Sequence, residues 1–168
     1  MKKYILIFGL LLANASLFSQ ELKNNANWTE TINYLTKNLP VLDHTYTIYY
    51  ENDSPSKQDK KYTISGNKII NFNKYKEDKE GYSDAASLKA LHKVTVNESV
   101  MKLYFVKNAV GRNNAAPHTN IMYLSLTKTA SHVTGKSTYT LSSKSKKIQA
   151  LYKAFNRLAY LADKRRNK

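Results

Sequence analysis

The sequence predicts an α+β fold: an antiparallel, strongly curved sheet of about six strands, with an N-terminal helix and a long C-terminal helix packed on it. Three observations lead to this prediction. A short segment with apolar residues at helical spacing lies near residue 30, and a longer one ends the chain. Between them, short alternating segments are separated by turn-forming residues, as in strands joined by hairpins. Runs of strands between terminal helices are typical of α+β domains.

The first twenty residues, MKKYILIFGLLLANASLFSQ, have the layout of a secretory signal peptide, with a basic start, an apolar stretch and small residues at the end. Cleavage after Ala15 or after Ser19 fits this layout. We therefore expect residues 1–19 to be a signal peptide and residues 20–168 to form a single α+β domain with a basic C-terminal tail. The apolar stretch is shorter than the about 20 residues of a membrane span, which disfavours an uncleaved anchor. The expected location is periplasmic or extracellular.

A capping box predicts the start of the first helix, because Asn27 is followed three residues later by Glu30. Pro40 is expected to end this helix, since proline cannot continue the helical hydrogen-bond pattern. The apolar residues at helical spacing are Trp28, Ile32, Leu35 and Leu39. They predict a short helix with one clear apolar face.

Several strands are predicted between the helices. The alternation in HTYTIYY indicates a strand over residues 44–50. Two hairpins are expected next, one turning at Gly66-Asn67 and one turning at residues 97–99. Further strands are expected in NIMYLSLTK and in STYTLSS. The segments SPSKQDK, KEDKEGYSD and VGRNNAAPHTN are predicted to be loops, and DAASLKAL is predicted to be either a short helix or an irregular approach to the next strand.

The C-terminal helix, from Ser145 to about Asp163, has the clearest pattern in the chain. Placed at 100° per residue, its apolar side chains fall in one arc of roughly 200°, wider than the stripe of an ordinary surface helix. These side chains belong to Ala150, Leu161, Ala154, Leu158, Leu151, Ala162, Phe155, Ile148, Ala159 and Tyr152. Because the polar arc is narrow, we expect the helix to pack on a sheet rather than to lie in a membrane interface.

A strongly bent sheet closed by a C-terminal helix resembles a pleckstrin-homology-like barrel. This resemblance rests on the order of the elements and on the long closing helix, and the additional N-terminal helix departs from it. The closing sequence ALYKAFNRLAYL is also similar to the C-terminal helices of many small exported bacterial proteins. The first resemblance implies a fold, and neither implies an activity.

Positive charge is concentrated near the C-terminus. The formal net charge is +15, and residues 128–168 contain eleven lysines or arginines and one acid. Such a region attracts anions, so the expected partners are an anionic polymer such as nucleic acid, an acidic polysaccharide or an anionic membrane surface. A compositional alternative is a genome poor in G and C, whose codons favour Lys, Asn, Ile and Tyr. That alternative explains the total charge better than its position.

An anion-binding site is predicted at the start of the C-terminal helix, from Ser143, Lys144, Ser145, Lys146 and Lys147. Helix N-termini carry partial positive charge, so lysines there are unfavourable by a few tenths of a kcal/mol each. Free backbone N–H groups together with lysines would form a site for phosphate, sulfate or carboxylate. The alternative is that these are surface lysines whose small cost is tolerated.

No metal or cofactor site is predicted from the sequence. The chain has no cysteine, which excludes disulfides, thiol catalysis and cysteine-based metal sites. Its histidines, His44, His92, His118 and His132, lack the spacing of metal ligands. The segment ASHVTGKS resembles a relaxed phosphate-binding loop, but the segment after it is strand-like where that motif requires a helix.

The sequence therefore predicts a non-catalytic exported domain that binds an anionic partner through its basic C-terminal region. One alternative is a secreted, metal-free phosphodiesterase or nuclease-type enzyme that uses the loop histidines His118 or His132 as acid and base. Another alternative is a protein-binding module that uses exposed strand edges.

Overall fold

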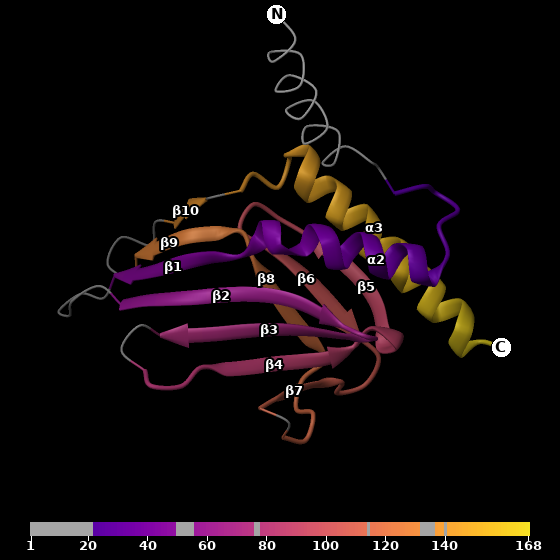
Figure 1. Ribbon diagram of the computed structural model, residues 1–168, viewed down its shortest axis with the longest axis horizontal. Helices are drawn as coiled ribbons and strands as arrows, with labels where there is room; N and C mark the ends of the chain where they lie inside the picture. Colours follow the sequence, from indigo (N-terminus) through magenta and orange to yellow (C-terminus); the bar gives the residue numbers. More distant parts are fainter. Residues whose placement is uncertain (1–21, 50–55, 76–77, 114, 132–136, 140) are drawn as a thin grey trace, which may run out of the picture.

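The computed structural model describes residues 22–49, 56–75, 78–113, 115–131, 137–139 and 141–168. The protein has an α+β fold with a helix at each end of the described chain and two β-sheets between them (Figure 1). The predicted fold class and terminal helices are therefore confirmed. The predicted signal peptide and His132 lie outside the described residues.

The larger sheet, sheet A, has seven strands. Their spatial order is β10 (Ser137–Tyr139), β9 (Thr127–Ser131), β1 (His44–Tyr49), β2 (Ser56–Ser65), β3 (Lys68–Tyr75), β4 (Tyr82–Ser87) and β7 (Val110–Arg112). Neighbouring strands are antiparallel except for β1 and β9, which are parallel. The predicted turn at Gly66-Asn67 joins β2 to β3, and Gly66 has the positive φ of 57° that a glycine adopts readily.

The smaller sheet, sheet B, consists of β5 (Leu91–Val96), β6 (Val100–Phe105) and β8 (Ile121–Ser125), all antiparallel. It lies behind sheet A in Figure 1, and its strands cross those of sheet A at a steep angle. The predicted hairpin at residues 97–99 joins β5 to β6, and Asn97 closes the turn by accepting hydrogen bonds from the backbone N–H groups of Ser99 and Val100. The buried Leu126 separates β8 from β9, so the chain passes from sheet B to sheet A at this residue.

The prediction of one strongly curved sheet is wrong. In the described part of the chain, ten strands form two sheets, and the strands are neither strongly curled nor closed into a barrel. A pattern of alternating residues identifies single strands, but it does not show which strands pair. The segment NIMYLSLTK contributes to two strands in different sheets. This separation into two layers, rather than bending of one sheet, encloses the core.

Each of the four segments predicted as a loop or as irregular structure contains strand residues, and β4 begins at Tyr82, within KEDKEGYSD. β2 begins at Ser56, within SPSKQDK; β4 covers the start of DAASLKAL before a short 3-10 turn, η2 (Leu88–Ala90); and β7 lies at the start of VGRNNAAPHTN. These strands are short or polar and have no run of buried apolar residues at every second position. The pairing with their neighbours, which is a tertiary interaction, makes them strands.

The N-terminal helix α2 (Trp28–Asn38) has the predicted capping box. The Asn27 side chain accepts a hydrogen bond from the Glu30 backbone, and the Glu30 carboxylate accepts one from the Asn27 backbone. Pro40 lies in the short 3-10 helix η1 (Leu39–Leu42) that follows, so the helix ends where predicted. The Trp28 indole donates to Asn67 Oδ1 at 2.9 Å, which attaches α2 to the turn between β2 and β3.

The C-terminal helix α3 (Lys146–Arg166) begins after Ser145, as predicted, and continues three residues beyond the predicted end. Its buried residues are Ile148, Leu151, Ala154, Phe155, Leu158, Ala159 and Ala162, all from the predicted apolar arc. The helix packs against β5, η2 and α2, which confirms that it covers a sheet. Side chains from both helices and both sheets form one hydrophobic core. Among the described residues, no helix is long and apolar enough to cross a membrane.

Candidate functional site

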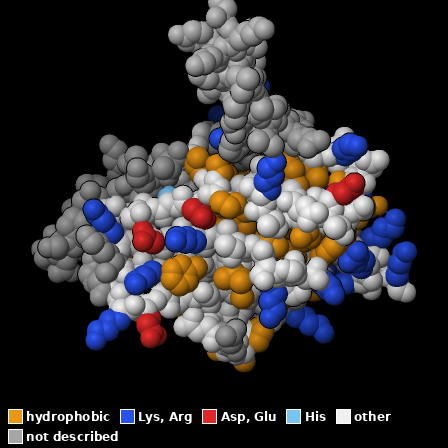
Figure 2. All heavy atoms as spheres, in the orientation of Figure 1, with side chains coloured by type: hydrophobic (Ala, Val, Ile, Leu, Met, Phe, Trp, Pro, Cys, Tyr) orange, Lys and Arg blue, Asp and Glu red, His pale blue; other side chains and the backbone are white. Residues whose placement is uncertain are grey.

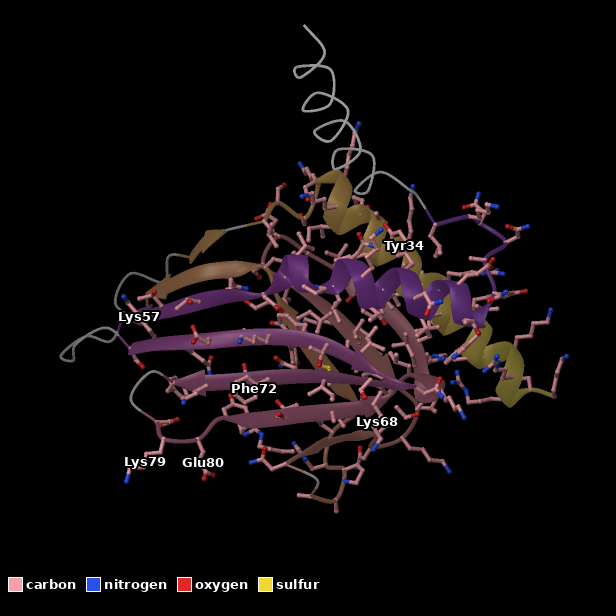
Figure 3. The ribbon with its side chains drawn as sticks, viewed as in Figure 1. Tyr34, Lys57, Lys68, Phe72, Lys79 and Glu80 are labelled. Atoms are coloured by element: carbon pink, nitrogen blue, oxygen red, sulfur yellow. The ribbon has the colours of Figure 1, made fainter. Side chains whose placement is uncertain are left out.

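The face of sheet A that turns toward sheet B changes from apolar to polar along its strands. On β3, Ile69 is fully buried, and the next two residues on the same face are Asn71 and Asn73, which are 6% and 2% exposed. Phe72 alternates with them and lies on the opposite face of the strand (labelled in Figure 3). Two buried asparagines in succession are unusual in a strand, because a buried amide is costly unless it is hydrogen bonded.

The polar residues of neighbouring strands lie directly opposite one another. Lys60 on β2 is opposite Asn73, and Asn73 is opposite Tyr82 on β4. In the next row, Asn71 is opposite Asp84 on β4. These five side chains come from three adjacent strands and face the same space, because side chains on one face of a sheet point in one direction.

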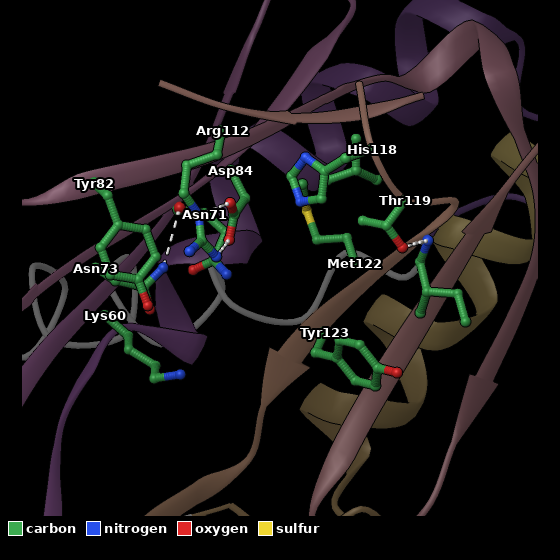
Figure 4. A pocket seen from close by; sticks show the side chains of 12 residues that line it. Lys60, Asn71, Asn73, Tyr82, Asp84, Arg112, His118, Thr119, Met122 and Tyr123 are labelled. Atoms are coloured by element: carbon green, nitrogen blue, oxygen red, sulfur yellow. Dashed lines mark hydrogen bonds and ion pairs between the residues drawn. The ribbon is translucent and has the colours of Figure 1, made fainter. Parts of the chain in front are cut away.

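A cavity of about 270 Å³ lies beneath this polar patch (Figure 4). Its lining residues are Lys60, Asn71, Asn73, Tyr82, Asp84, Val110, Arg112, His118, Thr119, Ile121, Met122 and Tyr123. The last three come from β8, the edge strand of sheet B, and His118 and Thr119 come from the segment that leads into β8. The cavity therefore lies where the polar end of sheet A meets the edge of sheet B. Its volume is close to the lower limit of the usual range for small-molecule sites, about 300–1,000 Å³.

Arg112 and Asp84 form an ion pair at one side of the cavity. Arg112 Nε donates to Asp84 Oδ1 at 2.8 Å, and Arg112 Nη2 donates to Asp84 Oδ2 at 3.3 Å. The guanidinium group also lies 4.3 Å from the centre of the Tyr82 ring. The hydrogen bond with Asp84 raises the pKa of Arg112. The fork of Arg112 is thus already occupied by a carboxylate, and the two charges compensate each other.

Lys60 is the second cation of the cavity. Burial of its side chain lowers the pKa of Lys60 below the usual lysine value, and the nearby carboxylate of Asp84 partly opposes this shift. A desolvated ammonium group gains more from an incoming anion than an exposed one does, because the local dielectric constant is lower. The lining of the cavity thus includes two cations, Lys60 and Arg112, and one carboxylate, Asp84.

The buried Asn71 side chain supplies a hydrogen-bond acceptor. Within the described part of the chain, Asn71 Oδ1 is buried and accepts no hydrogen bond. The backbone oxygen of Asn71, in contrast, accepts one from Asn73 Nδ2 at 3.3 Å. An unsatisfied buried acceptor costs about 1–3 kcal/mol, so a donor that enters the cavity and bonds to Asn71 recovers this energy.

The remaining walls provide the imidazole of His118, the phenol groups of Tyr82 and Tyr123, and several apolar groups. His118 is held by its backbone N–H, which donates to the Val110 oxygen at 3.0 Å, and Figure 4 places its ring beside Met122. Tyr82 Oη accepts a hydrogen bond from Gln58 at 3.3 Å. Among the described residues, no group of three or more His, Asp or Glu side chains could hold a metal ion. The chemistry available is therefore a cation, an acceptor, an imidazole and an apolar wall.

The residues of the predicted anion site lie at the start of α3, and several of their polar groups bond to neighbouring residues of the chain. Ser145 caps the helix, with its Oγ accepting from the Ile148 backbone at 3.4 Å. The Gln149 side chain donates to the Ser143 oxygen at 2.6 Å, and the Lys144 backbone donates to Ser142 Oγ at 3.2 Å. The three lysine side chains of the site, Lys144, Lys146 and Lys147, are exposed.

The arginines of the basic C-terminal region make contacts within the protein. Arg157 donates to the Ala26 oxygen at 2.8 Å, and Arg166 donates to the backbone oxygen of Lys89 at 2.7 Å. The guanidinium group of Arg165 lies 4.4 Å from the centre of the Trp28 ring. Part of the positive charge near the C-terminus therefore fixes α3 to the rest of the fold. Figure 2 shows Lys and Arg side chains spread over the described part of the viewed face, including the end where α3 finishes.

The three histidines within the described ranges lie on different parts of the fold. His118 lines the cavity, His92 is exposed on β5, and His44 on β1 has its Nδ1 2.6 Å from the Leu42 oxygen. The strand position predicted for His44 and the loop position predicted for His118 are confirmed.

The cavity itself was not predicted. The sequence signal that could have found it is the pair Asn71 and Asn73, spaced as on one face of a strand, next to apolar Ile69. Lys60, in contrast, belongs to a segment whose polar composition predicts a loop. No family model matches the chain, and no curated protein or solved structure shows significant similarity to it. The resemblance to pleckstrin-homology-like barrels and to small exported bacterial proteins stays a prediction.

Proposed function

We propose that the protein is a non-catalytic binding domain whose cavity takes a small ligand with one negatively charged group and at least one hydroxyl or amine donor. The observation that carries this proposal is the buried, unpaired Asn71 Oδ1 in a cavity that also contains Lys60. Lys60 would hold the anionic group, and Asn71 would accept a hydrogen bond from the ligand. Small hydroxy acids and sugar acids have both features.

Catalysis is the alternative to binding in this cavity. General acid–base catalysis needs groups placed to donate and to accept a proton at the reacting atoms. Of the two histidines of the catalytic alternative, His118 lines the cavity and His132 lies outside the described residues. The phosphodiesterase alternative is a second candidate, because His118 and Lys60 share one cavity. Survival of RNA and DNA at micromolar protein, with and without added metal, would argue against it.

The binding proposal is tested by titrating the protein with D-galacturonate and D-gluconate in a calorimeter, with D-galactose as the uncharged control. We expect both acids to bind and galactose to bind at least tenfold more weakly, a difference of about 1.4 kcal/mol or more. Lys60→Gln is expected to remove this preference for acids. Lys61→Gln is the matched control, since Lys61 is the next residue of β2 and is exposed. Absence of binding by both acids would contradict the proposal.

We also propose, as at the sequence level, that the protein is exported and that its basic C-terminal region attracts an anionic partner. The observation that favours the start of α3 is its first turn, which has three exposed lysines around it and no acidic residue. Replacing Lys144, Lys146 and Lys147 by glutamine is expected to lower the salt concentration at which heparin releases the protein. A triple variant of the exposed Lys57, Lys61 and Lys68 loses the same charge and serves as the control.

A further inference from the structure

Sheet B presents lysine and tyrosine side chains on the face opposite its core side. On β6, Met101, Leu103 and Phe105 are buried, and the residues that alternate with them include Lys102 and Tyr104. On β8, Tyr123 is 52% exposed although both of its neighbours along the strand are buried. A large exposed aromatic side chain on a sheet face is a candidate contact for a partner.

These side chains form a continuous strip across the three strands. Tyr123 on β8 lies directly opposite Lys102 on β6, and Tyr104 on β6 lies directly opposite Lys93 on β5. Lys102 Nζ is 5.5 Å from the centre of the Tyr123 ring, and Lys93 Nζ is 5.9 Å from the centre of the Tyr104 ring. We call these four residues the aromatic–basic strip. It covers two strand spacings, roughly 10 Å.

The strip begins at the cavity, because Tyr123 belongs to both. Tyr123 lines the cavity together with Met122, and Figure 4 shows its ring on β8. A ligand seated in the cavity can therefore continue past Tyr123 onto sheet B, where the next cation is Lys102. The cavity could therefore hold the end of a ligand whose remaining part extends along the aromatic–basic strip.

We propose that this surface binds a linear acidic polysaccharide, with one sugar acid in the cavity and the following units on the aromatic–basic strip. The inference rests on the proposed function of the cavity and extends it to a polymer. Sugar rings would lie against the flat faces of Tyr123 and Tyr104, while their carboxylates approach Lys102 and Lys93. The charge of the strip is complementary to that of such a polymer.

The groups on the surface favour a polysaccharide over a nucleic acid. Phosphates are bound most specifically by the fork of an arginine, and the arginine of the cavity, Arg112, already pairs with Asp84. The strip and the cavity offer lysines, which act as point charges and suit carboxylates equally well. Asn71 Oδ1 requires a donor such as a sugar hydroxyl, which every unit of a polysaccharide supplies.

The test compares D-galacturonate with its linear trimer by calorimetry at low salt. We expect the trimer to bind at least tenfold more tightly than the monomer and to lose this advantage as salt is added. The double variant Lys93→Gln/Lys102→Gln is expected to reduce the trimer's affinity to that of the monomer. The double variant Lys57→Gln/Lys61→Gln removes the same charge from exposed positions of β2 and is expected to keep the advantage.

A second variant tests the strip without changing the net charge of the protein. Tyr123→Ser removes the ring at the junction and is expected to weaken trimer binding at least threefold, while circular dichroism checks that the variant is folded. If the monomer binds and the trimer binds no more tightly, the proposal that the strip binds a polymer is contradicted, and the proposed function of the cavity is unaffected. If neither binds, the function of the cavity fails as well. If a single-stranded oligonucleotide of ten thymidines binds more tightly than the trimer, the polysaccharide assignment is overturned.

Discussion

Tyr62, on β2, connects sheet A to sheet B through a hydrogen bond. Its side chain is fully buried, and its hydroxyl oxygen accepts a hydrogen bond from the backbone N–H of Ser125 on β8 at 2.9 Å. Its own backbone N–H donates to Asp43 Oδ1 at 2.7 Å. Burial raises the pKa of Tyr62, so the hydroxyl stays neutral to a higher pH than an exposed tyrosine does.

Replacing Tyr62 by phenylalanine should therefore destabilise the protein without creating a large cavity. The Ser125 N–H would lose its partner, which costs about 1–3 kcal/mol for a buried donor. Urea denaturation measures this loss as a lower midpoint with an unchanged slope. Tyr123→Phe is the control, because Tyr123 is half-exposed and its change is expected to stay within about 0.5 kcal/mol. Equal effects of the two variants would contradict the role of Tyr62.

Lys60 is expected to make ligand affinity depend on pH. Its pKa is lowered in the folded protein, so it loses its proton at a lower pH than an exposed lysine does. Affinity for an anion should therefore fall as the pH rises toward the ordinary lysine value. Calorimetric titrations with D-galacturonate at a series of alkaline pH values measure this fall, and Lys60→Gln is expected to abolish it.

The lowered pKa of Lys60 also makes the stability of the folded protein depend on pH. Between the lowered pKa of Lys60 and its unfolded value, the unfolded chain binds more protons, so this residue makes the protein more stable as the pH rises. At neutral pH the charged form is a cost to the folded state. Lys60→Met is therefore expected to raise the melting temperature by about 2–4 °C, equivalent to about 1 kcal/mol. Lys61→Met, at the exposed neighbouring position, should leave it nearly unchanged.

At the scale of elements, the capping box of α2 is a local device with a measurable contribution. Replacing Asn27 by alanine removes the side-chain oxygen that accepts from the Glu30 backbone and should cost about 1 kcal/mol. Thermal denaturation followed by circular dichroism measures this cost. Asn24→Ala tests a nearby exposed asparagine outside the helix and is expected to have little effect. A loss of the same size in both variants would show that the cap is not responsible.

Helices and hairpins with local signals could be predicted from the sequence, and strands without them could not. The capping box and Pro40 locate α2, and the apolar arc locates α3 to within three residues at its end. Asn97 marks a turn because its side chain accepts a hydrogen bond within the turn, and Gly66 marks another because its backbone adopts a positive φ. β7 has three residues and depends on pairing with β4, which no local pattern records.

The site was missed for a related reason. A strand is recognised when its buried face is apolar, but the end of β2 that contains Lys60 and Gln58 has polar residues on its inner face. From the pattern of polar and apolar residues alone, this part of β2 cannot be distinguished from a loop. Only the pairing of β2 with β3, and the position of β8 beneath them, shows that these polar groups enclose a cavity.

For the whole molecule, the excess of positive charge is expected to oppose folding. The formal net charge is +15, and like charges are closer together in the compact state than in the unfolded chain. Raising the sodium chloride concentration from about 20 to 200 mM shortens the screening length and should raise the melting temperature by a few degrees. Differential scanning calorimetry measures this rise.

The matched control for this effect is a less charged form of the same protein. Replacing the exposed Lys57, Lys61 and Lys68 by glutamate lowers the net charge without touching the core. The rise of melting temperature with salt should be smaller in this variant. An equal rise would point to binding of a specific ion rather than to screening of the net charge.

The passage of the chain from one sheet to the other at Leu126 also constrains the order of folding. β9 pairs in parallel with β1, from which it is separated by nearly half of the chain, and β9 follows directly after β8. Closing so long a loop is entropically costly unless the intervening segments are already compact. Sheet B, built from a local hairpin and β8, is therefore expected to form early and to deliver β9 to its place. Until it does, β1 has a free edge, and a chain that stops short of Leu126 leaves that edge open to pairing between molecules.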